Sequence, residues 1–272
     1  MPRLDPGPVP APTNLGPFDL SFSEIGDGNM ERVLAERVNI NGNRKRFFAR
    51  LGVSWNDAAR IRPSHSPNVD LLAHVGDQSI YRRFLRTPLV EADFDFYRDG
   101  ADGLVTISQE QPISLITADC VPIAIWHPDG SVHGLVHAGL LPSLNGIVLS
   151  MAAALEFAGQ KTSQLQAYLG PSISAENYDL SRSGLWEVVG PSALACDALA
   201  PLLRRTMSGT HIDLRAAIVE QLCHVGFLDA NIQIFQPCTA ARDARYYSNY
   251  AAKHLGGKRG GFCSVIFPKA DQ

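Results

Sequence analysis

Runs of aliphatic and β-branched residues along the chain predict β-strands. They are bounded by glycine, proline and aspartate, which is typical of strands in a folded domain. A short apolar segment, VDLLAHVG (69–76), comes first. The stronger runs are GLVTI (103–107), ISLITADCVPIAIW (113–126), SVHGLVHA (131–138), QAYLG (166–170), NIQIFQPC (231–238) and GFCSVIFP (261–268).

Apolar positions with helical spacing lie before and after the central strands. The predicted helices are the second half of 31–53, then 145–159, 182–206 and 212–225. The first of them places Phe47, Phe48 and Leu51 on one side and ends at Gly52. Strands mixed with helices predict an α/β or α+β fold, in which helices cover a mostly antiparallel sheet.

Two of the central runs are joined by Pro128-Asp129-Gly130 and therefore predict a hairpin. With the turn at Asp129 and Gly130, His137 lies opposite Pro122, and Cys120 is its diagonal neighbour on the same face. Diagonal Cβ atoms lie roughly 7 to 8 Å apart, so the thiol and the imidazole can bind one metal ion. A lone cysteine in a strand is more often part of the core, so both interpretations stay open at this point.

Charge and composition indicate which kind of partner and which cellular compartment to expect. The formal net charge is −3 and no long basic block is present, so nucleic acid and anionic membranes are not expected partners, whereas a small molecule is. Five scattered cysteines suit a reducing compartment. There is no signal-peptide core and no apolar run of ~18 residues, so we expect a cytoplasmic protein. These patterns do not indicate an oligomeric state.

Several short sequence motifs occur along the chain. They are NRKRFFARLG (43–52), ADGLVT (101–106), TADCVP (117–122), VHAG (136–139), LGPSI (169–173) with a tyrosine at 178, HIDLRAAIVEQL (211–222), CT (238–239) and YYS (246–248). Together they closely resemble the laccase-domain family, whose members are also called multicopper polyphenol oxidases and are associated with purine nucleoside phosphorylase activity. The resemblance spans about residues 20–270.

The resemblance implies a single α/β/β/α sandwich domain with mixed, mostly antiparallel sheets. We expect this domain over residues 19–272, after a proline-rich tail over 1–18 that has no periodic apolar face.

The resemblance also implies a catalytic zinc site made of one cysteine and two histidines. Cys120 matches the family cysteine, His137 matches its second histidine, and His74 in LAHVG is the candidate for the first, with His65 as the substitute. His133 would lie roughly 13 Å from His137 along a strand, which is too far for the same ion. Copper is less suitable than Zn²⁺, because the eight histidines are scattered without a His-x-His pair.

Further positions are candidates for substrate binding. Tyr178 is able to stack on a base or to pack at the edge of the core, and Asp102 is either a turn residue or a polar wall of the site. Leu140-Leu141-Pro142 stands where the family has Trp-Arg-Gly. In the family the arginine suits an anionic co-substrate, whereas Leu141 makes this part of the site apolar. Because the arginine is missing at Leu141, we expect phosphate to bind poorly. Arg259 is the candidate for a cation that compensates for this loss.

Three classes of function compete at this stage. The first is a zinc-dependent enzyme that acts on purine nucleosides by phosphorolysis, hydrolysis or deamination. The second is a diverged enzyme of the same fold that acts on another small molecule, in biosynthetic tailoring or in cell-wall precursor editing. The third is a non-catalytic binding protein that contains the metal. The TADCVP and VHAG motifs favour an enzyme over a non-catalytic protein. The arginine that is missing at Leu141 separates the first class from the second.

Overall fold

A computed structural model describes residues 13–31, 37–75, 78–84, 100–187, 190 and 200–269. Within these residues the largest sheet contains β4 (Val69–Val75), β5 (Gln78–Phe84), β6 (Gly103–Thr106), β8 (Val121–Trp126), β9 (His133–Ala138), β10 (Gln166–Leu169) and β13 (Ile232–Ile234). Its strand order is β13-β10-β8-β9-β6-β4-β5. The hairpin β8–β9 therefore lies in the interior of this seven-stranded sheet.

A second sheet joins the two ends of the described chain. It contains β1 (Thr13–Asn14), β2 (Phe18–Phe22), β3 (Ala59–Arg60), β7 (Ile113–Thr117) and β14 (Phe262–Pro268), in the order β1-β2-β14-β7-β3. Both sheets are mostly antiparallel, although β3 with β7, β4 with β6, and β10 with β13 pair in parallel. A separate ribbon is formed by β11 (Met207–Ser208) and β12 (His211–Ile212).

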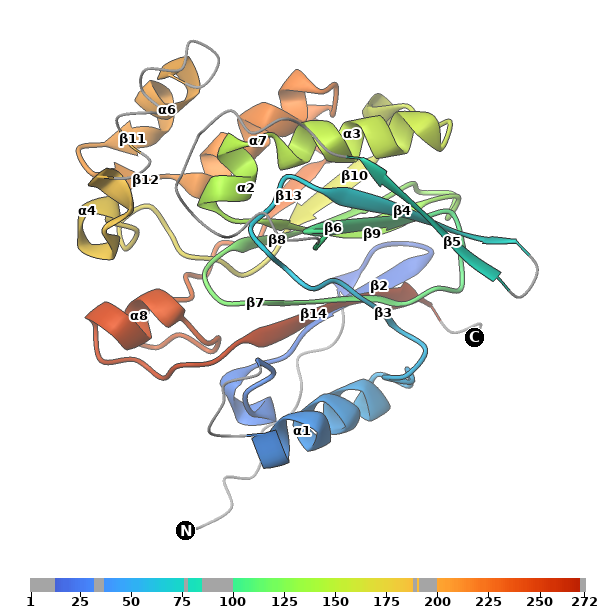
Figure 1. Cartoon of the computed structure of the whole chain (residues 1–272), viewed down its shortest axis with the longest axis horizontal. Helices are drawn as coiled ribbons and strands as arrows, with labels where there is room; N and C mark the ends of the chain where they lie inside the picture. Colours follow the sequence, from blue (N-terminus) through green and yellow to red (C-terminus); the bar gives the residue numbers. More distant parts are fainter. Residues whose placement is uncertain are drawn as a thin grey trace.

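The helices lie on the outer faces of the two sheets or beside the sheets (Figure 1). They are α1 (Arg37–Arg50), α2 (Leu140–Leu144), α3 (Ile147–Phe157), α4 (Leu180–Ser183), α6 (Ala200–Thr206), α7 (Leu214–His224) and α8 (Asn249–His254). Single 3-10 turns lie at Ile25–Asp27, Thr162–Gln164 and Asp229–Asn231. Figure 1 shows α3 and α7 over the seven-stranded sheet and α1 beneath the five-stranded sheet. This layer order confirms the predicted α/β/β/α sandwich.

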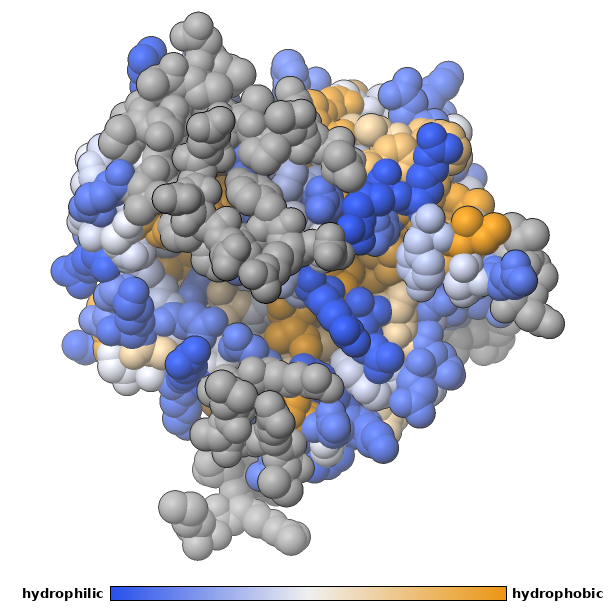
Figure 2. All heavy atoms as spheres, in the orientation of Figure 1, coloured by the Kyte–Doolittle hydropathy of each residue, from blue (hydrophilic) through white to orange (hydrophobic). Residues whose placement is uncertain are grey.

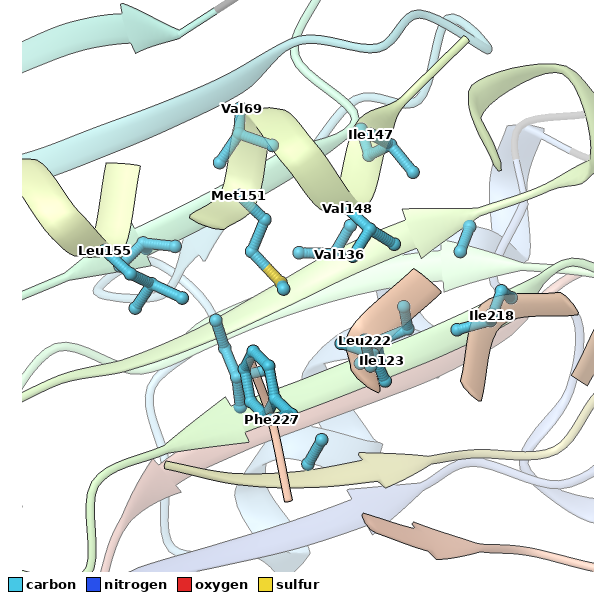
Figure 3. Packing of buried hydrophobic residues seen from close by; sticks show 14 of the residues in the cluster. Val69, Ile123, Val136, Ile147, Val148, Met151, Leu155, Ile218, Leu222 and Phe227 are labelled. Carbon is cyan, nitrogen blue, oxygen red and sulfur yellow. The ribbon is translucent and has the colours of Figure 1, made fainter. Parts of the chain in front are cut away.

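Side-chain alternation along β8 explains why both faces of the larger sheet are buried. Ile123 belongs to the cluster under α3 and α7, whereas Ala124 and Trp126 pack between the two sheets. In Figure 3, Met151 of α3 and Leu222 of α7 lie in the same cluster as Ile123. Each fully buried aliphatic side chain contributes about 1.5–3 kcal/mol, so these layers hold the hairpin firmly in place.

The helix predicted before the first strong strand run is confirmed as α1. Phe47 and Phe48 are fully buried and pack against Cys263 and Val265 of β14. Gly52 has a φ of 70°, a left-handed conformation that favours glycine and follows the end of the helix. The face of α1 that the spacing identified is therefore the face that covers the five-stranded sheet.

The predicted hairpin register is also confirmed. Pro122 pairs with His137, and Trp126 pairs with His133. The turn contains Gly130, whose φ of 81° favours glycine and whose N–H donates to the His127 carbonyl at 2.9 Å. His137 therefore occupies the expected position on the strand.

The run 113–126 is not one strand as the pattern suggested. Its first part is β7 of the five-stranded sheet and its last part is β8 of the seven-stranded sheet, so the chain crosses between the sheets at residues 118–120. Asp119, at this crossing, has a φ of 77°, which breaks the strand geometry. Cys120 consequently lies in a bend just before β8.

Some predicted segments are described only in part. Residues 1–12 of the expected tail, and residues 188–189 and 191–199 of the expected helix over 182–206, lie outside the described residues. None of the helices in the described ranges is long and apolar enough to cross a membrane.

Figure 2 shows one face that is mostly polar, with hydrophobic residues gathered near α3 and β5. Phe157 and Ile80, which belong to these elements, are about half exposed.

Candidate metal centre

The crossing between the sheets brings three ligand-type side chains together. One nitrogen of His65, one nitrogen of His137 and the sulfur of Cys120 all lie within 4.8 Å of one another. The two imidazole rings meet nearly at right angles, with their centroids 5.1 Å apart. In the described part of the chain, no other group of three histidine, cysteine or acidic residues comes this close together.

Asp102 holds two of these residues in position. Its fully buried carboxylate accepts a hydrogen bond from Nδ1 of His137 at 2.7 Å, and the N–H of His137 donates to the Asp102 carbonyl at 2.6 Å. The same carboxylate accepts the backbone N–H groups of Ser64, His65 and Ser66 at 2.8–3.0 Å. His65 has a left-handed φ of 61°, and these bonds hold it in that unusual conformation.

Asp119 fixes the crossing from the opposite side. One of its carboxylate oxygens accepts the hydroxyl of Thr239 at 2.7 Å, and the other accepts the N–H of Tyr250 in α8 at 2.7 Å. Asp119 is thus a structural hydrogen-bonding residue. It ties the bend that carries Cys120 to a segment more than 100 residues later in the chain.

Gly139 allows the centre to be closely packed. A Cβ atom on this residue would lie 2.7 Å from Sγ of Cys120 and 3.6 Å from the His65 ring, which is too close to the sulfur. The glycine of the VHAG word is therefore required by a close approach, because any side chain there would displace the thiol.

Without a metal ion, the electrostatics favour a thiolate at Cys120 beside a protonated His137. Burial lowers the pKa of His137, but the charge of the Cys120 thiolate and the hydrogen bond to Asp102 raise it to about 10, so a metal ion would displace this proton. Burial alone would raise the pKa of the Cys120 thiol, but the charge and hydrogen bond of His137, followed by those of His65, lower it to about 6. Burial also acts against the charge of Asp102, yet the hydrogen bond and charge of His137 and the N–H groups of Ser64 and Ser66 lower its pKa to about 2. The charged forms of both acids are therefore stable at neutral pH.

This donor set fits a zinc ion. A thiolate and two neutral imidazoles are common Zn²⁺ ligands, and three protein ligands leave a position for a reactant. Because Asp102 accepts from Nδ1–H of His137, it leaves Nε2 of that ring as the ligand atom. Multicopper chemistry needs several centres with many histidines, whereas only two of the eight histidines gather here.

A cavity of about 510 Å³ opens onto the centre, which is within the size range of small-molecule sites. His65, Cys120 and His137 form part of its wall. Most of the remaining wall comes from α1, β3 with the residues that follow it, β7 with the next residue, and the first residue of α8, and Glu31 and Trp55 complete it. The cavity is therefore built mainly on the five-stranded sheet, beside the crossing.

The cavity wall carries charged residues that the sequence patterns did not single out. Arg44, Arg60 and Arg62 line it together with a single acidic residue, Glu31. The guanidinium groups of Arg44 and Arg60 lie 5.2 and 5.0 Å from the ring centroid of Trp55, which also lines the cavity. One signal was present in the sequence, because Arg60-Ile61-Arg62 alternates charged and apolar residues just before His65.

The structure places His65, and not His74, beside Cys120 and His137. His74 is exposed on β4, where its Nε2 donates to Gln111 at 3.1 Å and its Nδ1 accepts from Ser79 at 3.1 Å. The choice of His74 as third ligand is corrected, because His65 is the histidine that Asp102 carries into the cluster. The segment LAHVG resembles the family's histidine motif in sequence, but its histidine does not lie in the cluster.

None of the four predicted substrate-binding residues is among the described residues that line the cavity. Tyr178 packs edge-on against Tyr250, with ring centroids 6.0 Å apart, and burial followed by the charge of the Cys120 thiolate raises its pKa. Leu141 is buried in α2, and Arg259 is exposed in the loop before β14. Asp102 supports the ligands from behind.

His133 has the packing role that its distance suggested. It is fully buried, its ring lies 4.3 Å from that of Phe18, and its Nε2–H donates to the Gln111 carbonyl at 2.7 Å. It therefore belongs to the core between the sheets.

One family model matches residues 22–269, and the family is described as multi-copper polyphenol oxidoreductase laccase. The chain belongs to this family. It is 28% identical over 239 residues to a purine nucleoside phosphorylase of Mycobacterium bovis, covering 86% of this chain and 80% of the relative. It is 29% identical over 247 residues to a protein named adenosine deaminase RL5 from an unknown prokaryotic organism, covering 90% and 85%.

Solved structures support the fold of this family member. The protein YfiH of Bacillus licheniformis superposes with a TM-score of 0.68 at 21% identity, covering 93% of each chain. YlmD of Geobacillus stearothermophilus superposes with a TM-score of 0.68 at 22% identity, covering 93% of this chain and 91% of YlmD. The two-sheet sandwich is therefore shared across nearly the whole chain.

Proposed function

We propose that this protein is a zinc-dependent enzyme that acts on purine nucleosides. The observation that carries the proposal is the cluster of His65, Cys120 and His137 in the wall of a cavity of about 510 Å³. Relatives that align over four fifths or more of their length are named purine nucleoside phosphorylase and adenosine deaminase. A metal-type centre next to a cavity of this size suits an enzyme better than a purely structural metal site.

Each residue of the centre has a distinct task in this proposal. His65, Cys120 and His137 would hold the Zn²⁺ ion, which supplies Lewis-acid chemistry when it is bound. Asp102 keeps a proton on Nδ1 of His137, so that Nε2 faces the centre, and it also holds the backbone of His65. The buried carboxylate thus sets the direction of two ligands at once.

Glu31 is suited to hold the substrate. Its Oε2 is buried in the cavity wall and has no hydrogen-bond partner among the described residues. A carboxylate only accepts hydrogen bonds when it is ionised, so it suits a ribose hydroxyl or an N–H of a base. Satisfying this buried acceptor would add to the affinity for a nucleoside.

The metal is tested first. Purified wild-type protein should contain about one zinc per chain, and the content should fall in Cys120→Ser, His137→Ala and His65→Ala, because three ligands are needed for tight binding. His74→Ala is the matched control and should retain wild-type zinc, since its ring bonds elsewhere. Elemental analysis measures the content. Unchanged zinc in all three ligand variants would refute the site.

The activity is tested with the zinc-loaded protein. Adenosine, inosine and guanosine are incubated with and without phosphate, and the products separate phosphorolysis, hydrolysis and deamination. We expect turnover that His65→Ala abolishes and His74→Ala retains. Normal zinc content without turnover of any nucleoside would favour an enzyme for another small molecule, or a non-catalytic metal protein.

A further inference from the structure

We propose that Arg60 and Arg62 bind a phosphate group in the cavity beside the metal centre. The proposal rests on the proposed function and deepens it, because it names the anionic group that the same cavity accepts. The shared chemistry is a phosphate dianion, either free inorganic phosphate or the phosphate of a nucleoside monophosphate.

The backbone directs both arginines to one face. Arg60 ends β3, an edge strand that pairs with β7 through Arg60 and Ser114, and the N–H of Ile61 donates to the Ser114 carbonyl at 2.9 Å. The Ile61 side chain is buried in the core between the sheets. Because side chains alternate along an extended chain, Arg60 and Arg62 point to the opposite face, and both line the cavity.

Neither arginine is paired with an acidic residue of the described ranges. Among the residues that the structure describes, no carboxylate pairs with Arg60 or Arg62, whereas Arg50, Arg205 and Arg245 each form an ion pair. Arg60 lies against the ring of Trp55, which restricts its side chain without using its N–H donors. Two guanidinium groups with free donors are suited to grip a phosphate.

The charge of the wall points the same way. Arg44, Arg60 and Arg62 face only Glu31 among the described lining residues, so the wall carries an excess of positive charge. Arg60 and Arg62 are exposed to solvent, and a concave basic wall concentrates anions. His65 lies three residues after Arg62, so one short segment would present both the anion and a ligand of the centre.

The expectation of weak phosphate binding depended on Leu140-Leu141-Pro142, which stand where the family has an arginine. Arg60 and Arg62 offer cationic groups at a different place. Leu140, Leu141 and Pro142 form α2 and are buried, with Leu141 packed against Leu180 and Ile212. They are absent from the described lining of the cavity. A missing arginine in that turn therefore says little about anion binding in this chain.

Inorganic phosphate at this place would support phosphorolysis. A phosphate oxygen forms a bond to C1′ of the nucleoside, the bond from C1′ to the purine nitrogen breaks, and the nitrogen takes up a proton from phosphate or water. The products are the free base and ribose 1-phosphate, so no oxidant or reductant is needed.

The test measures binding directly on the full-length, zinc-loaded protein. Inorganic phosphate, adenosine 5′-monophosphate and adenosine are titrated by calorimetry into wild type, Arg60→Gln, Arg62→Gln and the double variant. Each glutamine should weaken phosphate-group binding by about tenfold or more, because a hydrogen bond to a charged group is lost. Arg242→Gln, at an exposed arginine outside the described lining, is the matched control and should bind as wild type does.

The outcomes separate the two proposals. Arginine-dependent binding of inorganic phosphate supports free phosphate as the ligand, and arginine-dependent binding of the monophosphate alone supports a nucleotide. Equal affinities in wild type and the double variant, or no binding of either phosphate compound to wild type, would overturn the subsite. Arginine-dependent phosphate binding without turnover of any nucleoside would instead refute only the proposed function. Zinc content and melting temperature of each variant exclude misfolding.

Discussion

Single residues decide how the clustered histidines and cysteine are held, and Asp102 accepts hydrogen bonds there from several donors. Its carboxylate serves the backbone of Ser64, His65 and Ser66 and the imidazole of His137. All of these donors are N–H groups, so only an acceptor satisfies them. Asparagine has nearly the same shape but would place an NH₂ group against some of them.

We therefore expect Asp102→Asn to lower zinc affinity by about 10- to 100-fold, because one amide oxygen cannot take the place of both carboxylate oxygens, so the hold on the His137 ring or on the backbone around His65 is weakened. Competition with a zinc chelator measures this affinity. Asp70→Asn is the control, since Asp70 pairs with Arg83 on the neighbouring strand β5. Equal zinc affinity in Asp102→Asn and wild type would contradict the role of this carboxylate.

At the scale of elements, the crossing from β7 to β8 depends on a contact with the C-terminal part of the chain. Asp119 has a φ of 77° and binds Thr239 and the first turn of α8. Both donors would be left without a partner in the buried interior if the carboxylate were removed. The bend that carries Cys120 would also lose its anchor.

We expect Asp119→Ala to lower the free energy of unfolding by about 2–4 kcal/mol, because two buried donors are left unsatisfied. Asp119→Asn should have a smaller effect, since its amide oxygen still accepts from Thr239. Urea denaturation measures both. Asp243→Ala, at an exposed aspartate, should remain within about 0.5 kcal/mol of wild type. A cost for Asp119→Ala as small as that of Asp243→Ala would show that the anchor is dispensable.

For the whole molecule, the core between the two sheets contains a buried histidine that makes stability depend on pH. Burial lowers the pKa of His133 to about 4, and its hydrogen bond to the Gln111 carbonyl opposes this effect. The unfolded chain binds a proton at this histidine below a pH of about 6.5, whereas the folded protein does so only near pH 4. Stability from this group is thus complete above pH 6.5 and is lost as the pH falls towards 4.

We expect His133 to contribute about 3 kcal/mol to the fall in unfolding free energy between pH 6.5 and pH 4. His133→Phe should remove this part of the pH dependence, because phenylalanine does not titrate. Denaturation at a series of pH values measures the slope. His224→Gln, at an exposed histidine of α7, should retain the wild-type slope. An unchanged slope in His133→Phe would assign the acid sensitivity to other groups.

The hairpin and the helices were predictable from the sequence because their signals are local. Strand alternation and the Asp129-Gly130 turn set which residues face each other, and the structure pairs Pro122 with His137 as expected. The spacing of Phe47 and Phe48 likewise identified the buried face of α1. The same register predicted Cys120 near His137, and the structure brings the two together, although Cys120 lies in the bend before β8 and not in the strand. Two of the three clustered residues were therefore found.

The third residue of the cluster and the division of the run 113–126 between two sheets depend on contacts between segments that are distant in the sequence. Local patterns of apolar and polar residues carry no information about such contacts. Asp102 draws His65 into the cluster by accepting N–H groups from residues 64–66, whereas His74 fits a short word but faces away. Burial of apolar side chains on both faces divides one apolar run between two sheets, so 113–126 bends at Asp119. The sequence by itself thus determined elements, register and two clustered residues, because these follow from periodicity and turn chemistry. Only the tertiary structure decided the third clustered residue and the arginine-lined cavity, because packing and buried hydrogen bonds choose which elements meet.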